Sequence, residues 1–261
     1  MTARTKTCEE CGASFEAEPV AFKGWESRCC DPCTEESRRA AEEAEALREA
    51  EIERERQRAR EEALEREADR AERFVDSITP ARFLDTRLDH PDFNRPLWER
   101  VKAWRATDER PWLGLVGITG GSKTRCAFRR LRLEPRIYID DVLSAGDPVP
   151  RIPIAAISGP AIGRLVVDRV SRDDDRAESA RRALDEIRDA WFLVIDELGK
   201  LRTSPAAIAE AFEILDHRHA ANLFTIWTSN SDPQSFCQAW PQEFAGPACG
   251  RIIDCSTIFT A

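Results

Sequence analysis

The sequence lacks any apolar run near the 18 residues that a membrane-spanning helix needs. Its start, Met1–Lys6, leads into polar sequence without the apolar segment of a secretory leader. We therefore expect a cytoplasmic protein with no membrane partner. Thiols stay reduced in that compartment, so for the nine cysteines, five of them within Cys8–Cys33, a metal site is favoured over disulfides.

Lysine is also scarce, since 34 of the 39 basic residues are arginine. Such an imbalance is typical of nucleotide-composition bias. A position that remains lysine in this chain indicates a need for a compact ammonium, because a guanidinium is a broad planar fork. The five lysines are Lys6, Lys23, Lys102, Lys123 and Lys200.

Most of the chain is expected to fold, because 42% of its residues are hydrophobic despite a net charge of -9. Over half of that net charge lies in residues 34–73, which contain neither Gly nor Pro and consist almost entirely of Glu, Arg and Ala. This composition predicts one exposed helix, roughly 60 Å long, as a spacer. A weak coiled coil and a partner-binding arm are the alternatives. The expected domains are a module at 1–33, the spacer at 34–73 and a globular domain at 74–261.

The first module has the spacing of a four-thiolate zinc site. Cys8-x2-Cys11 is followed after eighteen residues by Cys30-x2-Cys33, and two such pairs can hold one tetrahedral Zn²⁺. So short a segment needs a metal to fold, because it buries little apolar surface. A loose tail with incidental cysteines is the alternative. Cys29 adjoins Cys30, and we take Cys30 as the ligand because it keeps the two-residue spacing.

The globular domain alternates short apolar runs with helical patterns, which predicts an α/β fold with a parallel sheet flanked by helices. The domain begins with a proline-containing stretch, and a helix is expected after it, over 96–106. The expected strands are Trp112–Ile118, Arg151–Ile157, Trp191–Ile195, Phe224–Thr228 and Arg251–Phe259.

The first of these strands leads into a phosphate-binding pattern, G-x4-G-K-[ST], with Ser122 in place of the last glycine. Backbone N–H groups of such a loop converge on phosphates at a helix N-terminus. Lys123 supplies the ammonium for the β- and γ-phosphates of ATP, and Thr124 supplies a hydroxyl for Mg²⁺. A glycine-rich turn without a ligand is the alternative. The residues expected to hold the nucleotide are Gly117, Thr119, Gly120, Gly121, Ser122, Lys123 and Thr124.

Two further strands are expected to end at the same edge of the sheet. The apolar run at 191–195 ends in Asp196 and Glu197. Asp196 is predicted to hold Mg²⁺ and Glu197 to polarise the attacking water, as phosphoryl transfer requires. Asn230, which follows the strand at 224–228, is expected beside Asp196, where it could orient that water.

Together these motifs resemble Walker A, Walker B and sensor 1 of the AAA+ ATPases, and more narrowly the DnaC/IstB-type helicase-loader and transposition-helper group. The segments Ile78–Phe83 and Ser204–His219 also resemble that group, so that the likeness covers about residues 78–259. The resemblance implies a P-loop NTPase fold of the AAA+ type. It also implies that Arg251 is an arginine finger, with Arg218 as a second candidate for nucleotide sensing.

The same resemblance implies a DNA-facing helix at Ser158–Arg172, where Arg164, Arg169 and Arg172 are candidate phosphate contacts. The hypothesis is a phage- or mobile-element-type ATPase, slow and partner-stimulated, that loads a replicative helicase onto single-stranded DNA. It would assemble with itself or with the helicase, and the zinc module would contact a partner protein or nucleic acid. The alternatives are an IstB-like transposition helper on duplex DNA and an adaptor that binds ATP with little turnover.

Overall fold

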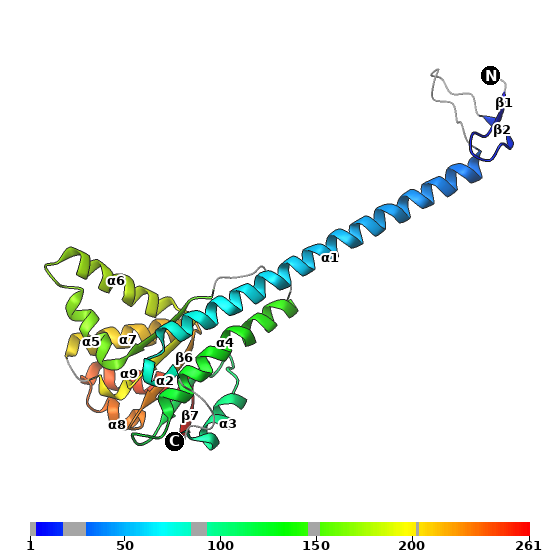
Figure 1. Cartoon of the computed structure of the whole chain (residues 1–261). Coiled ribbons are helices and arrows are strands. Elements are labelled where there is room, and N and C mark those ends of the chain that lie inside the picture. The colour runs from blue at the N-terminus through cyan, green and yellow to red at the C-terminus, as the bar shows by residue number, and fades with distance from the viewer. Residues whose placement is uncertain (1–3, 18–29, 85–92, 146–151, 202–203) are drawn as a thin grey trace. The chain divides into compact units, whose positions relative to one another are not determined.

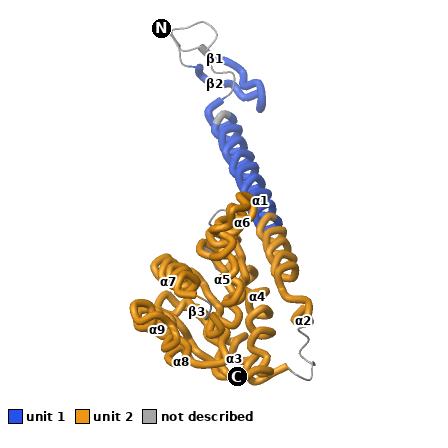
Figure 2. The backbone as a smooth tube through the Cα atoms, turned by 90° about the vertical axis from the view of Figure 1, so that its left-hand side faces the viewer, with its two compact units in different colours: residues 1–62 blue, residues 63–261 orange. Residues whose placement is uncertain are grey.

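The structure is a computed structural model that describes residues 4–17, 30–84, 93–145, 152–201 and 204–261. It divides into two compact units, Met1–Glu62 and Ala63–Ala261, which Figure 2 shows in different colours. The division falls inside one helix, α1 (Asp31–Ile78).

The first unit combines a small hairpin with the first part of α1. Strands β1 (Arg4–Thr7) and β2 (Ser14–Ala17) pair antiparallel. Gly12, in the turn between them, has a φ of 72°, which glycine adopts without strain. The side chains of α1 between residues 35 and 59 are exposed, and they form ion pairs one turn apart, such as Arg39 with Glu35. The predicted exposed helix is thus confirmed for this part.

The second part of α1 is a packed helix of the larger unit. Leu64, Ala68, Ala71 and Val75, spaced by three or four residues, are almost fully buried in its core. The expectation of a solvent-exposed helix up to residue 73 is therefore wrong for this part. The pattern was weak in the sequence because two of the four buried side chains are alanines.

Arg136 of α4 (Lys123–Ala145) ties the same part of α1 in place. Its guanidinium donates to the carboxylates of Glu65, Asp69 and Glu72, which lie one turn apart on α1. These bonds raise the pKa of Arg136. Figure 1 shows α4 running beside this part of α1.

Five parallel strands form the sheet of the larger unit, in the order β4-β5-β6-β3-β7. The predicted α/β class with a parallel sheet is confirmed. Its strands are β3 (Trp112–Val116), β4 (Ile154–Ser158), β5 (Phe192–Asp196), β6 (Phe224–Ser229) and β7 (Ser256–Thr260).

One strand prediction needs correction. Residues 251–255 belong to a helix, α9 (Gln242–Cys255), and only the following five residues form β7. Ile252 and Cys255 of this helix are buried, one turn apart, so the apolar run Ile252–Ile253 reflects a helix face rather than a strand.

Helices cover both faces of the sheet. Alternate residues of β5 show this, because Phe192 and Val194 pack into one core cluster while Leu193 and Ile195 pack into the other. The second part of α1, α3 (Arg95–Ala103) and α4 contribute to the first cluster. The helices on the second side are α5 (Gly159–Asp168), α6 (Asp174–Asp189), α7 (Pro205–Ala220), α8 (Pro233–Cys237) and α9.

Among the described residues, we find no helix with both the length and the apolar character needed to cross a membrane.

Candidate nucleotide and metal sites

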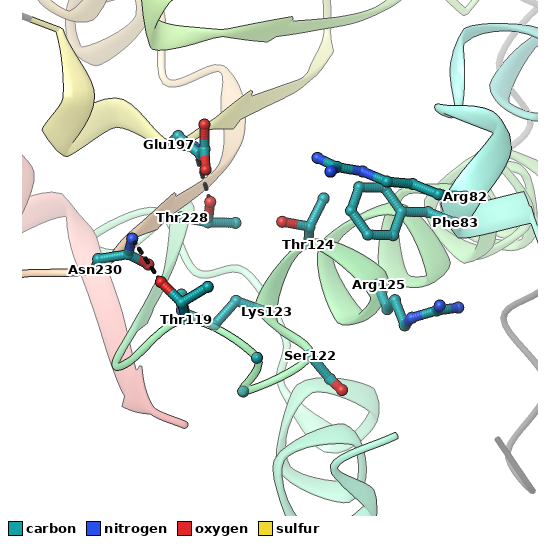
Figure 3. Close-up of a pocket in the computed structure, with 12 residues that line it drawn as sticks. Arg82, Phe83, Thr119, Ser122, Lys123, Thr124, Arg125, Glu197, Thr228 and Asn230 are labelled. Atoms are coloured by element: carbon teal, nitrogen blue, oxygen red, sulfur yellow. Dashed lines mark hydrogen bonds between the residues drawn. The ribbon is translucent and has the colours of Figure 1, made fainter. Parts of the chain in front are cut away.

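The strand order brings the predicted motifs to one edge of the sheet. Because all five strands are parallel, their carboxyl ends lie at the same edge, and β6 lies between β3 and β5. The phosphate loop follows β3, Asp196 ends β5, and Asn230 follows β6. A cavity of about 470 Å³ opens there (Figure 3), lined by Arg82, Phe83, Thr119, Gly120, Gly121, Ser122, Lys123, Thr124, Arg125, Glu197, Thr228 and Asn230.

The loop has a backbone that only glycine accepts at two of its positions. Gly117 and Gly120 have φ angles of 145° and 92°. A Cβ on Gly117 would also come within 2.7 Å of the carbonyl oxygen of Ala261. The amide of Gly117 donates to the carbonyl of Ser229 at 3.2 Å, which ties the start of the loop to the end of β6.

Ser122 is the loop residue that departs from the sequence pattern, and its φ of 59° lies in the left-handed region. For a residue with a Cβ this conformation costs about 1–2 kcal/mol. The side chain nevertheless makes a contact that glycine could not make. It is only 8% exposed, and its hydroxyl oxygen accepts a hydrogen bond from the amide of Asn94 at 3.2 Å.

Lys123 is the first residue of α4 and is buried. Its ammonium donates to the carbonyls of Gly117 and Ile118 at 2.9 and 2.7 Å, so the side chain curls back over the loop. Burial lowers the pKa of Lys123, and the nearby carboxylates of Asp196 and Glu197 oppose that shift. The other basic residues of α4 are five arginines, so the one lysine of this helix lies where the pattern requires an ammonium.

Thr124 and Asp196 meet although 72 residues separate them in the chain. The Thr124 hydroxyl donates to Oδ1 of Asp196 at 2.7 Å, and the Thr228 hydroxyl donates to the same oxygen at 2.7 Å. Hydroxyl and carboxylate oxygens are ligands that Mg²⁺ accepts. The donor set at this point therefore fits the predicted magnesium site.

Glu197 follows Asp196 in a left-handed conformation, with a φ of 56°. Its amide donates to the Thr228 hydroxyl at 2.9 Å, and its carboxylate pairs with Lys200 at the end of the short helix η1 (Leu198–Lys200). This backbone turns the carboxylate toward the cavity, which it lines. Asn230 lines the same cavity, and its amide donates to the Thr119 hydroxyl at 3.3 Å.

Four cavity residues were not predicted as site residues from the sequence, namely Arg82, Phe83, Arg125 and Thr228. Arg82 and Phe83 come from α2 (Ala81–Leu84), and Arg125 follows Thr124 directly. The guanidinium carbons of Arg82 and Arg125 lie 4.5 and 5.6 Å from the centre of the Phe83 ring, within cation–π range. Position next to Thr124 was a signal for Arg125, whereas nothing local links α2 to a loop that begins more than thirty residues later.

Arg251 does not precede a strand, as predicted, but lies in the last turns of α9. Its guanidinium pairs with Asp216 of α7 and lies over the ring of Phe212, with 4.8 Å between Cζ and the ring centre. An arginine finger reaches into another subunit, so Arg251 would have to leave Asp216 to act as one.

Arg218 is a structural residue, and the suggested sensing role is wrong. Its side chain is fully buried and donates to four main-chain carbonyls and to the Thr225 hydroxyl. These partners lie at the end of α6 and the start of β6, near the amino ends of the strands, whereas the phosphate loop follows the carboxyl end of β3. Burial lowers the pKa of Arg218 to about 9.

The three arginines predicted to contact DNA phosphates differ in exposure and in their partners within the fold. Arg169 pairs with the buried carboxylate of Glu210, which Arg188 also contacts. Arg164 and Arg172 are exposed, and so are Val167 and Val170 between them. Of the three, Arg164 and Arg172 therefore have the exposed side chains that contact with DNA phosphates requires.

The four predicted metal ligands come together in the first unit. The sulfur atoms of Cys8, Cys11, Cys30 and Cys33 all lie within 4.8 Å of one another. The sulfurs of Cys11 and Cys30 are 3.6 Å apart, close to the roughly 3.8 Å edge of a tetrahedron with Zn–S bonds near 2.3 Å. The donor set thus fits Zn²⁺. Cys29 lies outside the described residues.

Hydrogen bonds within this cluster shift the pKa values of its thiols. Hydrogen bonds from the amides of Cys11 and Cys30 lower the pKa of Cys8 to about 6. The neighbouring thiols of Cys11 and Cys30 raise the pKa of Cys33. A zinc ion binds thiolates, so it would release the protons of the remaining thiols when it binds.

We expect one zinc ion per chain in the purified full-length protein. Cys30→Ser should reduce the zinc content, measured by inductively coupled plasma mass spectrometry, to less than about half, because three thiolates hold zinc more weakly. Cys29→Ser is the matched control and should keep one zinc. The reverse result would show that Cys29 is the ligand.

No family model and no curated protein matches this sequence. Among solved structures, the chain is similar to the crystal structure of DnaI, with 19% identity, 71% of this chain and 95% of that chain covered, and a TM-score of 0.47. The chain is also similar to the crystal structure of the DnaC helicase loader, with 19% identity, 69% of this chain and 99% of that chain covered, and a TM-score of 0.46. A third similar structure is AMPPCP-bound DnaA from Aquifex aeolicus, with 12% identity and a TM-score of 0.43. The match covers 63% of this chain and 44% of that chain, so the chain spans less than half of that structure. These are likenesses of fold.

Proposed function

We propose that this chain binds ATP with Mg²⁺ and hydrolyses it. The observation that carries the proposal is the contact of the Thr124 hydroxyl with the Asp196 carboxylate, beside the Lys123 ammonium, at the mouth of a phosphate loop. Each of the three groups has a separate task in binding a nucleoside triphosphate. Asp196 comes from another strand, and its contact with Thr124 brings the carboxylate to the start of the helix that carries Lys123.

The loop and the start of α4 bind the phosphates in this proposal. The first amides of a helix have no partner within the helix and carry a partial positive charge. Lys123 adds a full charge in a buried place, where its interaction with phosphate is screened less than in water. Thr124 and Asp196 hold the magnesium ion, which neutralises charge on the phosphate oxygens.

Glu197 and Asn230 act on the water that attacks the γ-phosphorus. Glu197 accepts a hydrogen bond from this water, orients it and takes up its proton. The oxygen of the water forms the new bond to the γ-phosphorus, and ADP leaves with the electrons of the broken P–O bond. Asn230, next to Thr119 in the loop, holds the water or a γ-phosphate oxygen. Lys200 pairs with the Glu197 carboxylate, which is consistent with slow turnover until a partner binds.

We further propose that the chain uses ATP to help load a replicative helicase onto single-stranded DNA. The order of the motifs and their resemblance to helicase loaders support this role. The exposed Arg164 and Arg172, with Val167 and Val170 between them, offer cationic and apolar groups that a nucleic-acid strand could contact. In this role the chain assembles with itself or the helicase, and Arg251 contacts the γ-phosphate of a neighbouring subunit.

The loading role predicts an ATP-dependent complex with the replicative helicase of the same phage or host. The full-length chain and the purified helicase should co-elute from a size-exclusion column with ATP and Mg²⁺, and at least about tenfold less with ADP. The Lys123→Ala chain, which should not retain ATP, is the control and should behave as the wild type does without nucleotide. Absence of a complex with and without ATP would remove the loading role.

The two alternatives lead to different results in the same assays. A transposition helper would bind duplex DNA and the transposase rather than the helicase. An adaptor would bind ATP but show the same single-turnover rate as its Glu197→Gln variant. The strained backbone at Ser122 is the feature that supports the alternative of an adaptor with little ATP turnover.

A further inference from the structure

Ser122 occupies a position where the phosphate-loop pattern has glycine, and glycine would adopt its φ of 59° without strain. Strained residues persist in folded proteins where other contacts hold them, and they cluster at binding sites. The contacts of Ser122 should therefore show what the serine does that a glycine could not do.

The hydroxyl of Ser122 connects the loop to the start of α3. The amide of Asn94 donates to this hydroxyl at 3.2 Å, a bond that glycine could not accept. Asn94 is itself fixed, because its side chain caps α3 by accepting from the amide of Leu97 at 3.0 Å. Leu97 and Val101 anchor α3 in the core. The hydrogen bond therefore joins a glycine-rich loop to a rigid helix.

The connection leaves the cavity open to a phosphate. Figure 3 shows the Ser122 side chain directed away from Lys123 and Thr124. Its hydroxyl thus acts on the conformation of the loop and does not occupy the place of a ligand. Gly120 and Gly121 precede it, and ordering two successive glycines on binding costs conformational entropy. A contact that orders the loop beforehand reduces that cost.

We propose that Ser122 is a positioning residue that strengthens ATP binding by holding the phosphate loop, through the amide of Asn94, in the conformation that accepts phosphates. This inference rests on the proposed binding of ATP. It differs from the view that the serine merely obstructs the loop, because the two views predict opposite effects of a glycine.

The test compares Ser122→Ala and Ser122→Gly in the full-length chain. Alanine keeps the backbone strain and loses the hydroxyl, whereas glycine loses both. We expect both variants to bind ATP about 3- to 10-fold more weakly than the wild type, by isothermal titration calorimetry with Mg²⁺. The single-turnover rate at saturating ATP should stay within about twofold, because Lys123, Asp196 and Glu197 are unchanged.

A second pair of variants tests the partner amide. Asn94→Pro removes the N–H, and the φ of -77° at this position suits proline. Asn94→Ala is the matched control, since it removes the cap and keeps the N–H. We expect Asn94→Pro to weaken ATP binding as much as Ser122→Ala does, with no further loss when both are combined. Asn94→Ala should change the affinity less than twofold.

Thermal unfolding without nucleotide accompanies each measurement. If Asn94→Pro does not fold, the two Ser122 variants decide the matter alone. Tighter binding by Ser122→Gly, or wild-type affinity of Ser122→Ala, overturns the role of Ser122. A wild-type chain that binds no ATP at all overturns the proposed function, and the role of Ser122 falls with it.

Discussion

Lys123→Ala is expected to weaken ATP binding by about 100-fold or more. The ammonium forms charge-assisted hydrogen bonds to phosphate, and two such bonds at about 1.5–3 kcal/mol each account for a loss of this size. In the wild type these bonds replace those to the carbonyls of Gly117 and Ile118. Titration calorimetry with ATP and Mg²⁺ measures the effect.

Lys102→Ala is the matched control for this substitution. Lys102 is exposed on α3, and the contacts found for it use its main-chain carbonyl, so its loss should leave ATP affinity within about twofold. Both variants should keep the thermal stability of the wild type without nucleotide to within a few degrees. Full ATP affinity of Lys123→Ala would contradict the nucleotide site.

Glu197→Gln is expected to lower the single-turnover rate of ATP hydrolysis by about 10²- to 10⁴-fold. Glutamine keeps the size of the side chain but cannot accept a proton, and it loses the charge that orients the water. ATP affinity should change little, because Lys123, Thr124 and Asp196 remain in place. The chain should therefore retain ATP in a state ready for partner binding.

Glu186→Gln provides the control for charge alone. Glu186 is exposed on α6 and does not line the nucleotide cavity, so its variant should hydrolyse ATP at the wild-type rate. An unchanged rate in Glu197→Gln, together with tight ATP binding, would support the adaptor alternative instead.

The local motifs could be predicted because their chemistry depends on neighbouring residues. The loop at 117–124 and the cysteine pairs of the first module have spacings that are recognisable without a structure. The sheet strands were also predictable, since buried parallel strands form apolar runs. The strand expected at 251–255 was wrong because a short apolar run on a helix face resembles a buried strand.

The roles of the arginines could not be predicted, because a guanidinium binds partners far away in the sequence. Arg218 is used inside the fold, Arg169 pairs with Glu210, and Arg251 pairs with Asp216. In a chain with 34 arginines, the sequence offers no means of separating these from a free cation. The contribution of α2 to the cavity could not be predicted for the same reason, because its contacts there are with residues far away in the sequence.

The sequence by itself determined that a phosphate loop, an acidic strand end and a four-cysteine module are present, because each is written in consecutive or closely spaced residues. Only the tertiary structure decided that Thr124, Asp196 and Thr228 share one point. That outcome depends on β6 lying between β3 and β5. The left-handed Ser122 and its bond to Asn94 also became visible only there, because a backbone angle and a contact across 28 residues leave no pattern in the sequence.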